Sequence, residues 1–235
     1  MVRTLFLWFL LAHLIGDYYL QTQYLAQAKR QDSKQLIKHS LIYGAVFFVT
    51  LLILPEVKLI PILLGIIILH GLIDALKPEM EKYFPTAAYF IDQVIHILVL
   101  LLAAWWVRDL SWNRLSWTDE FMIRQILSAA VMVLILAKPA NLTIRLLLGK
   151  YSPTDKQSQA DESLLRGGRL IGTLERWLVF LLLLVNQWAA IGFVFAAKSI
   201  VRWKSISKDN TEYFLIGTLL SLIFVVATFY LIYLI

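Results

Sequence analysis

The chain has 235 residues, of which 60% are hydrophobic and none is cysteine. A soluble domain is roughly 45–50% apolar, so this composition predicts a membrane protein, and the lack of cysteine excludes disulfides, iron–sulfur clusters and thiolate zinc sites. The formal net charge of +6 is spread over the connections between apolar runs, which is typical of a positive-inside bias and requires no nucleic-acid partner.

Seven apolar segments predict an all-α fold, a polytopic transmembrane helical bundle of about seven transmembrane helices in one membrane domain, residues 1–235. Each segment is close to the ~20 residues that cross a hydrocarbon core, although the second is short. No small-residue cleavage site follows the first, so we interpret it as a retained helix and not as a signal peptide. The segments are 4–21, 40–54, 59–76, 88–107, 121–137, 171–198 and 212–235.

Basic residues between the segments predict the orientation of the helices. The connection 22–39 carries four of them against one acid, Asp32, which predicts a cytoplasmic position for it and an outer position for the N-terminus. The segment 138–170 is the longest polar region and predicts a cytoplasmic loop with an amphipathic surface helix at 141–149. The domain then consists of a four-helix half, residues 1–107, and a three-helix half, residues 121–235.

The sixth segment admits two topologies. Seven simple spans place the connection 198–211 outside, although it carries four basic residues. Asn186 and Gln187 lie near the middle of the segment, so a re-entrant hairpin would return this connection to the cytoplasm. Non-helical backbone is tolerated at membrane depth where protein or a cavity surrounds it. The sequence therefore leaves open whether 171–198 spans once or is re-entrant.

All four histidines of the chain lie in its first hundred residues, inside or at the edge of predicted transmembrane segments. Ionisable groups are costly in a bilayer, so these residues indicate a functional site. On the first helix, His13, Asp17 and Gln21 share one face at i, i+4 and i+8. The next three helices place their polar groups in the same leaflet, which predicts that all of them meet. These groups are His39 after Lys38, His70 with Asp74 and Lys77, and Asp92 and Gln93 with His96.

Imidazole and carboxylate groups in this number predict a divalent-metal site of one or two ions, with zinc, manganese or iron as the candidates. Some of the carboxylates can instead accept the far N–H of a ligating histidine. Asp17 and Asp92 are candidate general bases, and Lys77 is the candidate that stabilises developing negative charge. The candidate ligands are His13, Asp17, His39, His70, Asp74, Asp92 and His96. The candidates for substrate or ligand support are Gln21, Gln93, Lys38, Glu175 and Arg176.

Several functions are compatible with this pattern. The first is a metal-dependent hydrolase that acts on a lipid-like or phosphoester substrate, with membrane lipid and a small amphiphilic or lipid-linked substrate as partners and a homo-oligomer as a further possibility. The second is a proton- or cation-coupled transporter or channel that uses the same histidines and aspartates. The third is a non-enzymatic membrane protein whose 138–170 segment docks a cytosolic partner. A purely structural set of interhelical hydrogen bonds is the fourth.

The stretch His13-Leu-Ile-Gly-Asp17-Tyr-Tyr-Leu-Gln21 carries a family resemblance, together with six stretches further along the chain. With them, nearly the whole chain resembles a bacterial family of integral membrane proteins known as domain of unknown function 3307. The resemblance implies a multi-pass protein of the bacterial cytoplasmic (inner) membrane and carries no activity. The further stretches are 38–40, 70–77, 92–96, 168–176, 197–199 and 212–218.

A fainter resemblance is to the bacterial membrane-bound metal-dependent hydrolases. Lys38-His39-Ser40 is similar to their Thr-His-Ser step, and His70 with Asp74, followed by Lys77-Pro78, is similar to their Ser-His-x-x-x-Asp segment before Thr-Pro. Lys38 replaces the threonine, and their paired aspartate motif after the first helix is absent. This resemblance implies metal-dependent hydrolysis of a lipid or phosphoester at the cytoplasmic leaflet.

Overall fold

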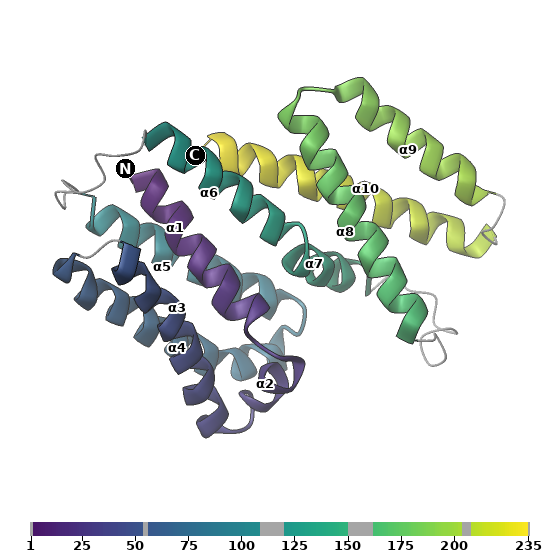
Figure 1. Cartoon of the computed structure of the whole chain (residues 1–235). Coiled ribbons are helices and arrows are strands. Elements are labelled where there is room, and N and C mark those ends of the chain that lie inside the picture. Colours follow the sequence, from purple (N-terminus) through teal and green to yellow (C-terminus); the bar gives the residue numbers. More distant parts are fainter. Residues whose placement is uncertain (1, 54–55, 109–119, 150–161, 204–207, 235) are drawn as a thin grey trace. The chain divides into compact units, whose positions relative to one another are not determined.

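The computed structural model describes residues 2–53, 56–108, 120–149, 162–203 and 208–234, and all regular structure within these ranges is helical (Figure 1). The predicted all-α class is therefore confirmed. The chain divides into two compact units, Met1–Val131 and Met132–Ile235. Each unit is described by itself below.

The first unit is built on four helices that pack side by side. α4 packs against both α3 and α5, and α1 packs against the same two helices (Figure 1). The start of α6 (Glu120–Ile135) also belongs to this unit. The elements are α1 (Val2–Leu14), η1 (Ile15–Tyr19), α2 (Gln23–Ala28), α3 (Ser33–Ile53), η2 (Val57–Leu59), α4 (Ile60–Tyr83) and α5 (Ala87–Trp106).

The inner face of each long helix is polar toward one end and apolar toward the other. On α5 the buried residues Ala88, Asp92, His96, Leu100 and Ala104 follow one another at intervals of four, and residues four apart lie on one face of a helix. The same order holds on the other two long helices, so the polar ends meet at one level and the apolar ends at another. Their buried residues are His39, Tyr43, Phe47 and Thr50 on α3, and Leu63, Ile66, His70 and Asp74 on α4. Thr50 is the polar exception at the apolar end, and its hydroxyl accepts from the Trp8 indole N–H at 3.1 Å.

The first predicted segment, 4–21, is not one continuous α-helix. α1 ends at Leu14 and continues as the π-helical turn η1, in which Leu20 N donates to Ile15 O at 2.9 Å. The wider turn interrupts the α-helical repeat, and the helix ends before Gln21. The expectation that His13, Asp17 and Gln21 share one α-helical face is therefore wrong. π-Turns inside helices occur frequently at functional sites, and this turn carries Asp17.

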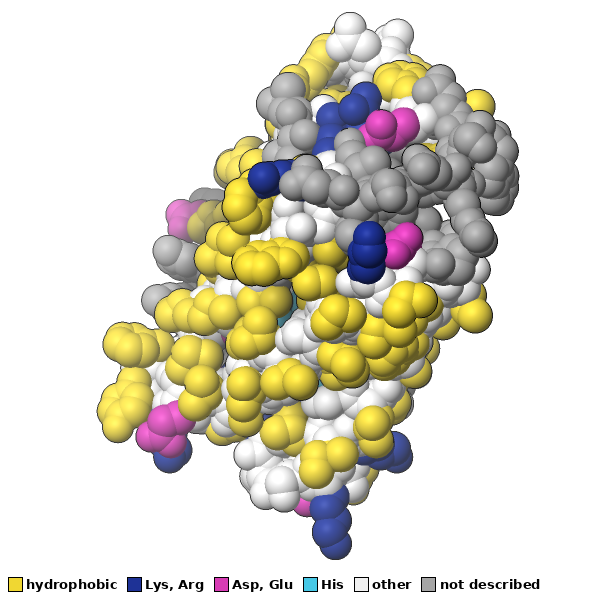
Figure 2. Space-filling model, turned by 90° about the vertical axis from the view of Figure 1, so that its left-hand side faces the viewer, with side chains coloured by type: hydrophobic (Ala, Val, Ile, Leu, Met, Phe, Trp, Pro, Cys, Tyr) yellow, Lys and Arg dark blue, Asp and Glu magenta, His cyan; other side chains and the backbone are white. Residues whose placement is uncertain are grey.

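The number of apolar spans is smaller than the predicted seven. Four helical segments are long and apolar enough to cross a membrane, and a fifth is added if α6 and α7, which meet at 42°, cross as one broken span. Figure 2 shows a broad band of hydrophobic side chains on one face, with charged side chains gathered toward its two ends. The membrane class is supported, whereas the count of about seven is not confirmed. The four segments are Ser33–Leu52, Val57–Tyr83, Ala87–Trp106 and Glu212–Tyr233.

The second unit contains the end of α6 and the helices α7 (Lys138–Leu148), α8 (Glu162–Leu184), α9 (Trp188–Trp203) and α10 (Lys208–Leu234). α10 packs against α7 and α8. The helix predicted at 141–149 is present and begins at Lys138, so most of the predicted loop 138–170 is helical. Residues 150–161 lie outside the described residues.

The sixth segment, 171–198, is divided into two helices. α8 ends at Leu184 and α9 begins at Trp188, and Asn186 between them takes the left-handed conformation with φ 54°. Gln187 N donates to Leu182 O at 2.8 Å and closes the turn. The segment is therefore not one continuous helix, and Asn186 and Gln187, which suggested a re-entrant hairpin, mark the break.

Gly16 permits the close approach of η1 to α3, and its replacement tests this contact. A Cβ atom at this position would stand 2.8 Å from Cδ2 of Tyr43, so Gly16→Ala should lower the free energy of unfolding by about 1–3 kcal/mol through overpacking. Thermal unfolding in detergent measures the effect. Gly65→Ala is the control, since nothing lies within 4 Å of its Cβ position. A Gly16→Ala protein as stable as the wild type would contradict this account.

Candidate metal centre

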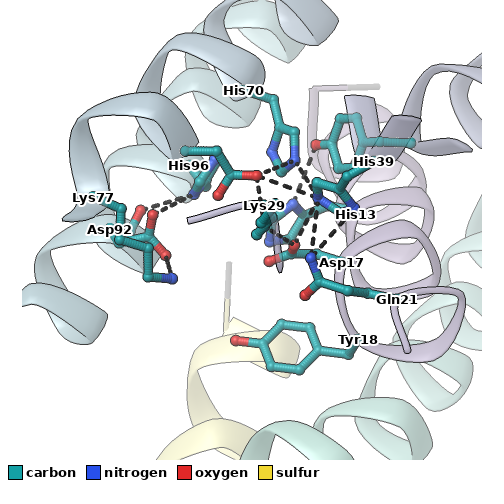
Figure 3. A network of polar contacts seen from close by, with 12 residues as sticks. His13, Asp17, Tyr18, Gln21, Lys29, His39, His70, Lys77, Asp92 and His96 are labelled. Atoms are coloured by element: carbon teal, nitrogen blue, oxygen red, sulfur yellow. Dashed lines mark hydrogen bonds and ion pairs between the residues drawn. The ribbon is translucent and has the colours of Figure 1, made fainter. Parts of the chain in front are cut away.

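His39 and His70 point at the same place inside the first unit (Figure 3), and the carboxylate of Asp74 reaches both of them. His39 comes from the start of α3, and His70 and Asp74 lie one turn apart on α4; they are 0%, 1% and 4% exposed. The Nε2 atoms of His39 and His70 are 3.0 Å apart. Oδ2 of Asp74 lies 3.3 Å from each of them. The three atoms form a nearly equilateral triangle.

The size of this triangle fits the coordination of a divalent ion. With metal–nitrogen and metal–oxygen bonds of 2.0–2.2 Å, two ligand atoms of a tetrahedral zinc site lie about 3.3–3.5 Å apart. Oδ1 of Asp17 adds a fourth atom, 3.3 Å from Nε2 of His39. One donor atom from each of Asp17, His39, His70 and Asp74 lies within 4.8 Å of the others. This donor set of two nitrogens and two oxygens suits zinc, iron or manganese.

A second group of possible ligands adjoins the first and shares Asp74. One donor atom from each of Asp74, Asp92 and His96 lies within 4.8 Å of the others. Nδ1 of His96 is 2.9 Å from the backbone carbonyl of Asp92. A carbonyl only accepts, so Nδ1 carries the proton and Nε2 is left with a free lone pair. Metal-ligating histidines are commonly oriented in this way.

Several polar atoms of this region are buried and lack a hydrogen-bond partner among the described residues. They include Nε2 of His96, Oδ1 of Asp92 and Nδ1 of His70. An unsatisfied buried polar group costs about 1–3 kcal/mol. The free lone pair on Nε2 of His96 lies beside the carboxylates of Asp74 and Asp92. Such an arrangement is what a cation-binding site requires.

Lys29 belongs to the site, although sequence reasoning did not include it. It follows α2 in the connection predicted to be a cytoplasmic loop, yet its side chain is only 7% exposed. Its Nζ lies 2.6 Å from Oδ2 of Asp74 and 3.8 Å from Oδ1 of Asp17. With the Gln21 amide turned to satisfy both its groups, its oxygen accepts from Nζ at 2.8 Å and its nitrogen donates to the Asp17 carbonyl at 3.1 Å.

His13 lies beside the two ligand groups and is a member of neither. Its Nδ1 is 3.1 Å from the hydroxyl of Tyr43, its Nε2 is 3.5 Å from Oε1 of Gln93, and its ring stacks on that of His96. Tyr43 also stacks on His70, with ring centroids 3.6 Å apart. Sequence reasoning did not include Tyr43, although its spacing of four from His39 marks the same helix face.

The remaining candidates are divided between the two units. Lys77 binds Oδ2 of Asp92 at 2.7 Å, and Gln93 donates to the same oxygen at 3.0 Å. Lys38 is exposed on α3. Two candidates, Glu175 and Arg176, lie in the second unit: Glu175 pairs with Lys198, and Arg176 donates to the Leu136 carbonyl at 2.7 Å and to Oδ1 of Asn141 at 2.6 Å.

Comparison with known proteins identifies a family for this chain. The family model described as "Protein of unknown function (DUF3307)" matches residues 5–123, just over half of the chain. The matched range contains both groups of possible metal ligands. No curated protein and no solved structure matches the chain. The predicted membership of this family is confirmed, over residues 5–123 and not over nearly the whole chain. The fainter resemblance to metal-dependent hydrolases gains no support.

The buried pair of Lys29 and Asp74 predicts a large coupling between the two side chains. Asp74→Asn should destabilise the protein by about 3–5 kcal/mol, because it leaves the Lys29 ammonium buried without its counter-charge. Adding Lys29→Met should recover part of this loss. Unfolding in metal-free detergent solution, measured for both single variants and the double variant, gives the coupling energy.

The exposed pair of Lys82 and Glu79, with side chains 66% and 59% exposed, is the matched control. Its coupling in the same cycle should stay below about 1 kcal/mol. Strictly additive effects at Lys29 and Asp74 would show that the buried pair does not act as a unit.

Proposed function

We propose a function for this chain, which belongs to the family of proteins of unknown function called DUF3307, from the geometry of its histidines and aspartates. The first unit holds a divalent-metal centre of one or two ions inside its helix bundle. The protein is a metal-dependent hydrolase of the bacterial cytoplasmic membrane, and its substrate is an ester or phosphoester of lipid-like character. The supporting observation is the triangle of donor atoms from His39, His70 and Asp74.

Convergence of these atoms favours an ion over a structural hydrogen-bond network. Two imidazole nitrogens 3.0 Å apart bond to each other only if one of them carries the proton. The remaining buried atoms, Nε2 of His96 and Oδ1 of Asp92, have no partner among the described residues. A structural network satisfies its buried polar atoms, because an unsatisfied one is costly. A cation in the first ligand group would take up the lone pairs of His39 and His70, and a cation in the second would take up the lone pair of His96.

A bound divalent ion supplies Lewis acidity, which makes a water molecule more acidic and polarises the oxygen of a bound ester. When an ion occupies the first ligand group alone, Asp92 is placed to act as the general base, since Lys77 and Gln93 hold its Oδ2 while Oδ1 has no hydrogen-bond partner among the described residues. Its carboxylate takes a proton from water as the water oxygen bonds to carbon or phosphorus. The C–O or P–O bond then breaks, and that proton passes to the leaving oxygen. The Lys77 ammonium stabilises the negative charge that develops.

The apolar surroundings of the site favour an amphiphilic substrate. On the outward face of α4, Ile68, Leu72 and Leu76 are 61%, 55% and 64% exposed within the chain. Such side chains are stable next to lipid tails. A substrate with acyl chains would approach the polar end of the bundle from the bilayer, whereas a small hydrophilic molecule would have to leave water.

The apolar half of the bundle argues against a path for protons or cations. Beyond the polar groups, the inner faces of the four helices carry apolar side chains. These are Phe9, Phe47, Leu63 and Leu100, and each is at most 1% exposed. They form an apolar layer next to the site, and a proton or ion pathway requires polar groups or water across the whole membrane. We therefore prefer the hydrolase to the transporter that uses the same residues.

Metal analysis of detergent-purified protein tests the centre directly. We expect one or two equivalents of zinc, manganese or iron in the wild type, and loss of most of this metal in His39→Ala and in His70→Ala. The matched control is His13→Ala, which removes a buried histidine outside both ligand groups and should retain its metal. Wild-type protein without metal, or full metal content in His70→Ala, would refute the centre.

Turnover of chromogenic probes tests the reaction. With metal present, the protein should hydrolyse p-nitrophenyl acyl esters or an acylated p-nitrophenyl phosphodiester, and chelation should stop it. Asp92→Asn should lower kcat by about 10²–10⁴-fold, the usual contribution of a general base, while the exposed control Glu79→Gln should not. If the probes are inert and proteoliposomes instead show a proton or cation flux that Asp74→Asn abolishes, the transporter is the correct function.

A further inference from the structure

We propose that the ammonium of Lys29 is an internal competitor of the divalent ion, which holds the metal-binding carboxylates in the ion-free protein and must leave Asp74 when an ion binds. This inference rests on the proposed metal centre and concerns how that centre is loaded. It assigns to Lys29 a role that neither its sequence position nor the family suggests.

One oxygen atom serves both cations. Oδ2 of Asp74 lies 2.6 Å from Nζ of Lys29 and also 3.3 Å from Nε2 of both His39 and His70. It is therefore at once the partner of the ammonium and the third corner of the triangle of donor atoms. An ion at the centre of that triangle would bond to the same oxygen atom that now accepts from Lys29.

The ammonium lies in a cage of oxygens, as a bound cation does. Oδ2 of Asp74 and the Gln21 amide oxygen accept from Nζ at 2.6 and 2.8 Å, and Oδ1 of Asp17 lies 3.8 Å away. Asp17 and Asp74 are also the two carboxylates of the first ligand group. Lys29 thus neutralises the same carboxylates that a divalent ion would neutralise.

Burial makes the competition strong. The exposed fractions of the Lys29 and Asp74 side chains are 7% and 1%, so water screens the pair poorly. An ion bonded to Oδ2 of Asp74 would stand within roughly 5 Å of Nζ, the sum of two bonding distances. Two positive charges at this separation repel strongly in a medium of low dielectric constant. Binding of the ion and retention of the ammonium on Asp74 therefore exclude each other.

Lys29 has a route out of the site. It follows the short helix α2, and the next residue, Arg30, is exposed and pairs with Glu81. A lysine side chain extends about four methylene groups and can turn its ammonium toward water while its stem stays packed. Exchange of the Lys29 ammonium for the divalent ion keeps the carboxylates of Asp17 and Asp74 neutralised with and without metal. It also lowers the affinity of the site for the ion, so that the ion can be released again.

Cobalt titration of the purified, metal-free protein in detergent measures the competition, because tetrahedral cobalt(II) has a visible absorption band. We expect Lys29→Met to bind cobalt at least tenfold more tightly than the wild type, and Lys29→Arg, which keeps the charge, to gain no affinity. Lys34→Met is the matched control, since it removes an exposed positive charge from the neighbouring start of α3. It should change the affinity less than twofold.

The wild-type protein supplies a second measurement that requires no variant to fold. Reductive methylation followed by mass spectrometry should modify Lys29 more when cobalt is bound than when it is absent, with Lys34 as the internal reference. Equal or weaker cobalt binding by Lys29→Met, or unchanged methylation of Lys29, would overturn the inference while leaving the metal centre intact. A wild-type protein that binds no cobalt would overturn the metal centre itself.

Discussion

The carboxylate of Asp74 is the group around which the first unit is assembled. Its Oδ2 atom meets Lys29, His39 and His70, which come from the turn after α2, from α3 and from α4. A charge buried this deeply costs several kcal/mol unless opposite charges and hydrogen-bond donors surround it. The three elements must therefore close around one atom, and their spacing fixes the positions of the other polar side chains.

The division of the inner helix faces into a polar end and an apolar end has the same origin. Polar groups inside a membrane protein are stable when they pair with other polar groups, so histidines and aspartates from four helices gather at one level. The rest of the core is mostly apolar, with Phe9 and Phe47 fully buried, and its buried Thr50 is satisfied by the Trp8 indole N–H at 3.1 Å. This layered core places the ligand groups at one level of the bundle, and we base our preference for a hydrolase over a conduction path on this arrangement.

The π-turn η1 connects the fold to the site. It widens the first helix at Asp17, allows Gly16 to approach Tyr43, and directs the chain into α2, which carries Lys29 inward. A regular α-helix through residue 21 would keep Gln21 on the first helix, and the connection 22–39 with Lys29 would then start further from the site. The local departure from α-helical geometry therefore brings a positive charge to the carboxylates.

The sequence by itself determined the all-α class, the family and the convergence of His39, His70, Asp74, Asp92 and His96, because helical spacing and the cost of intramembrane charge leave few alternatives. It did not determine the number of spans, since apolar length alone does not reveal the π-turn at Ile15–Tyr19 or the break at Asn186. Tertiary packing alone decided that Lys29 is a buried partner of Asp74 and that His13 stands outside the ligand groups. The position of Lys29 depends on how the backbone turns after Leu14, and a turn of this kind depends on contacts with residues distant in the chain, such as that of Gly16 with Tyr43.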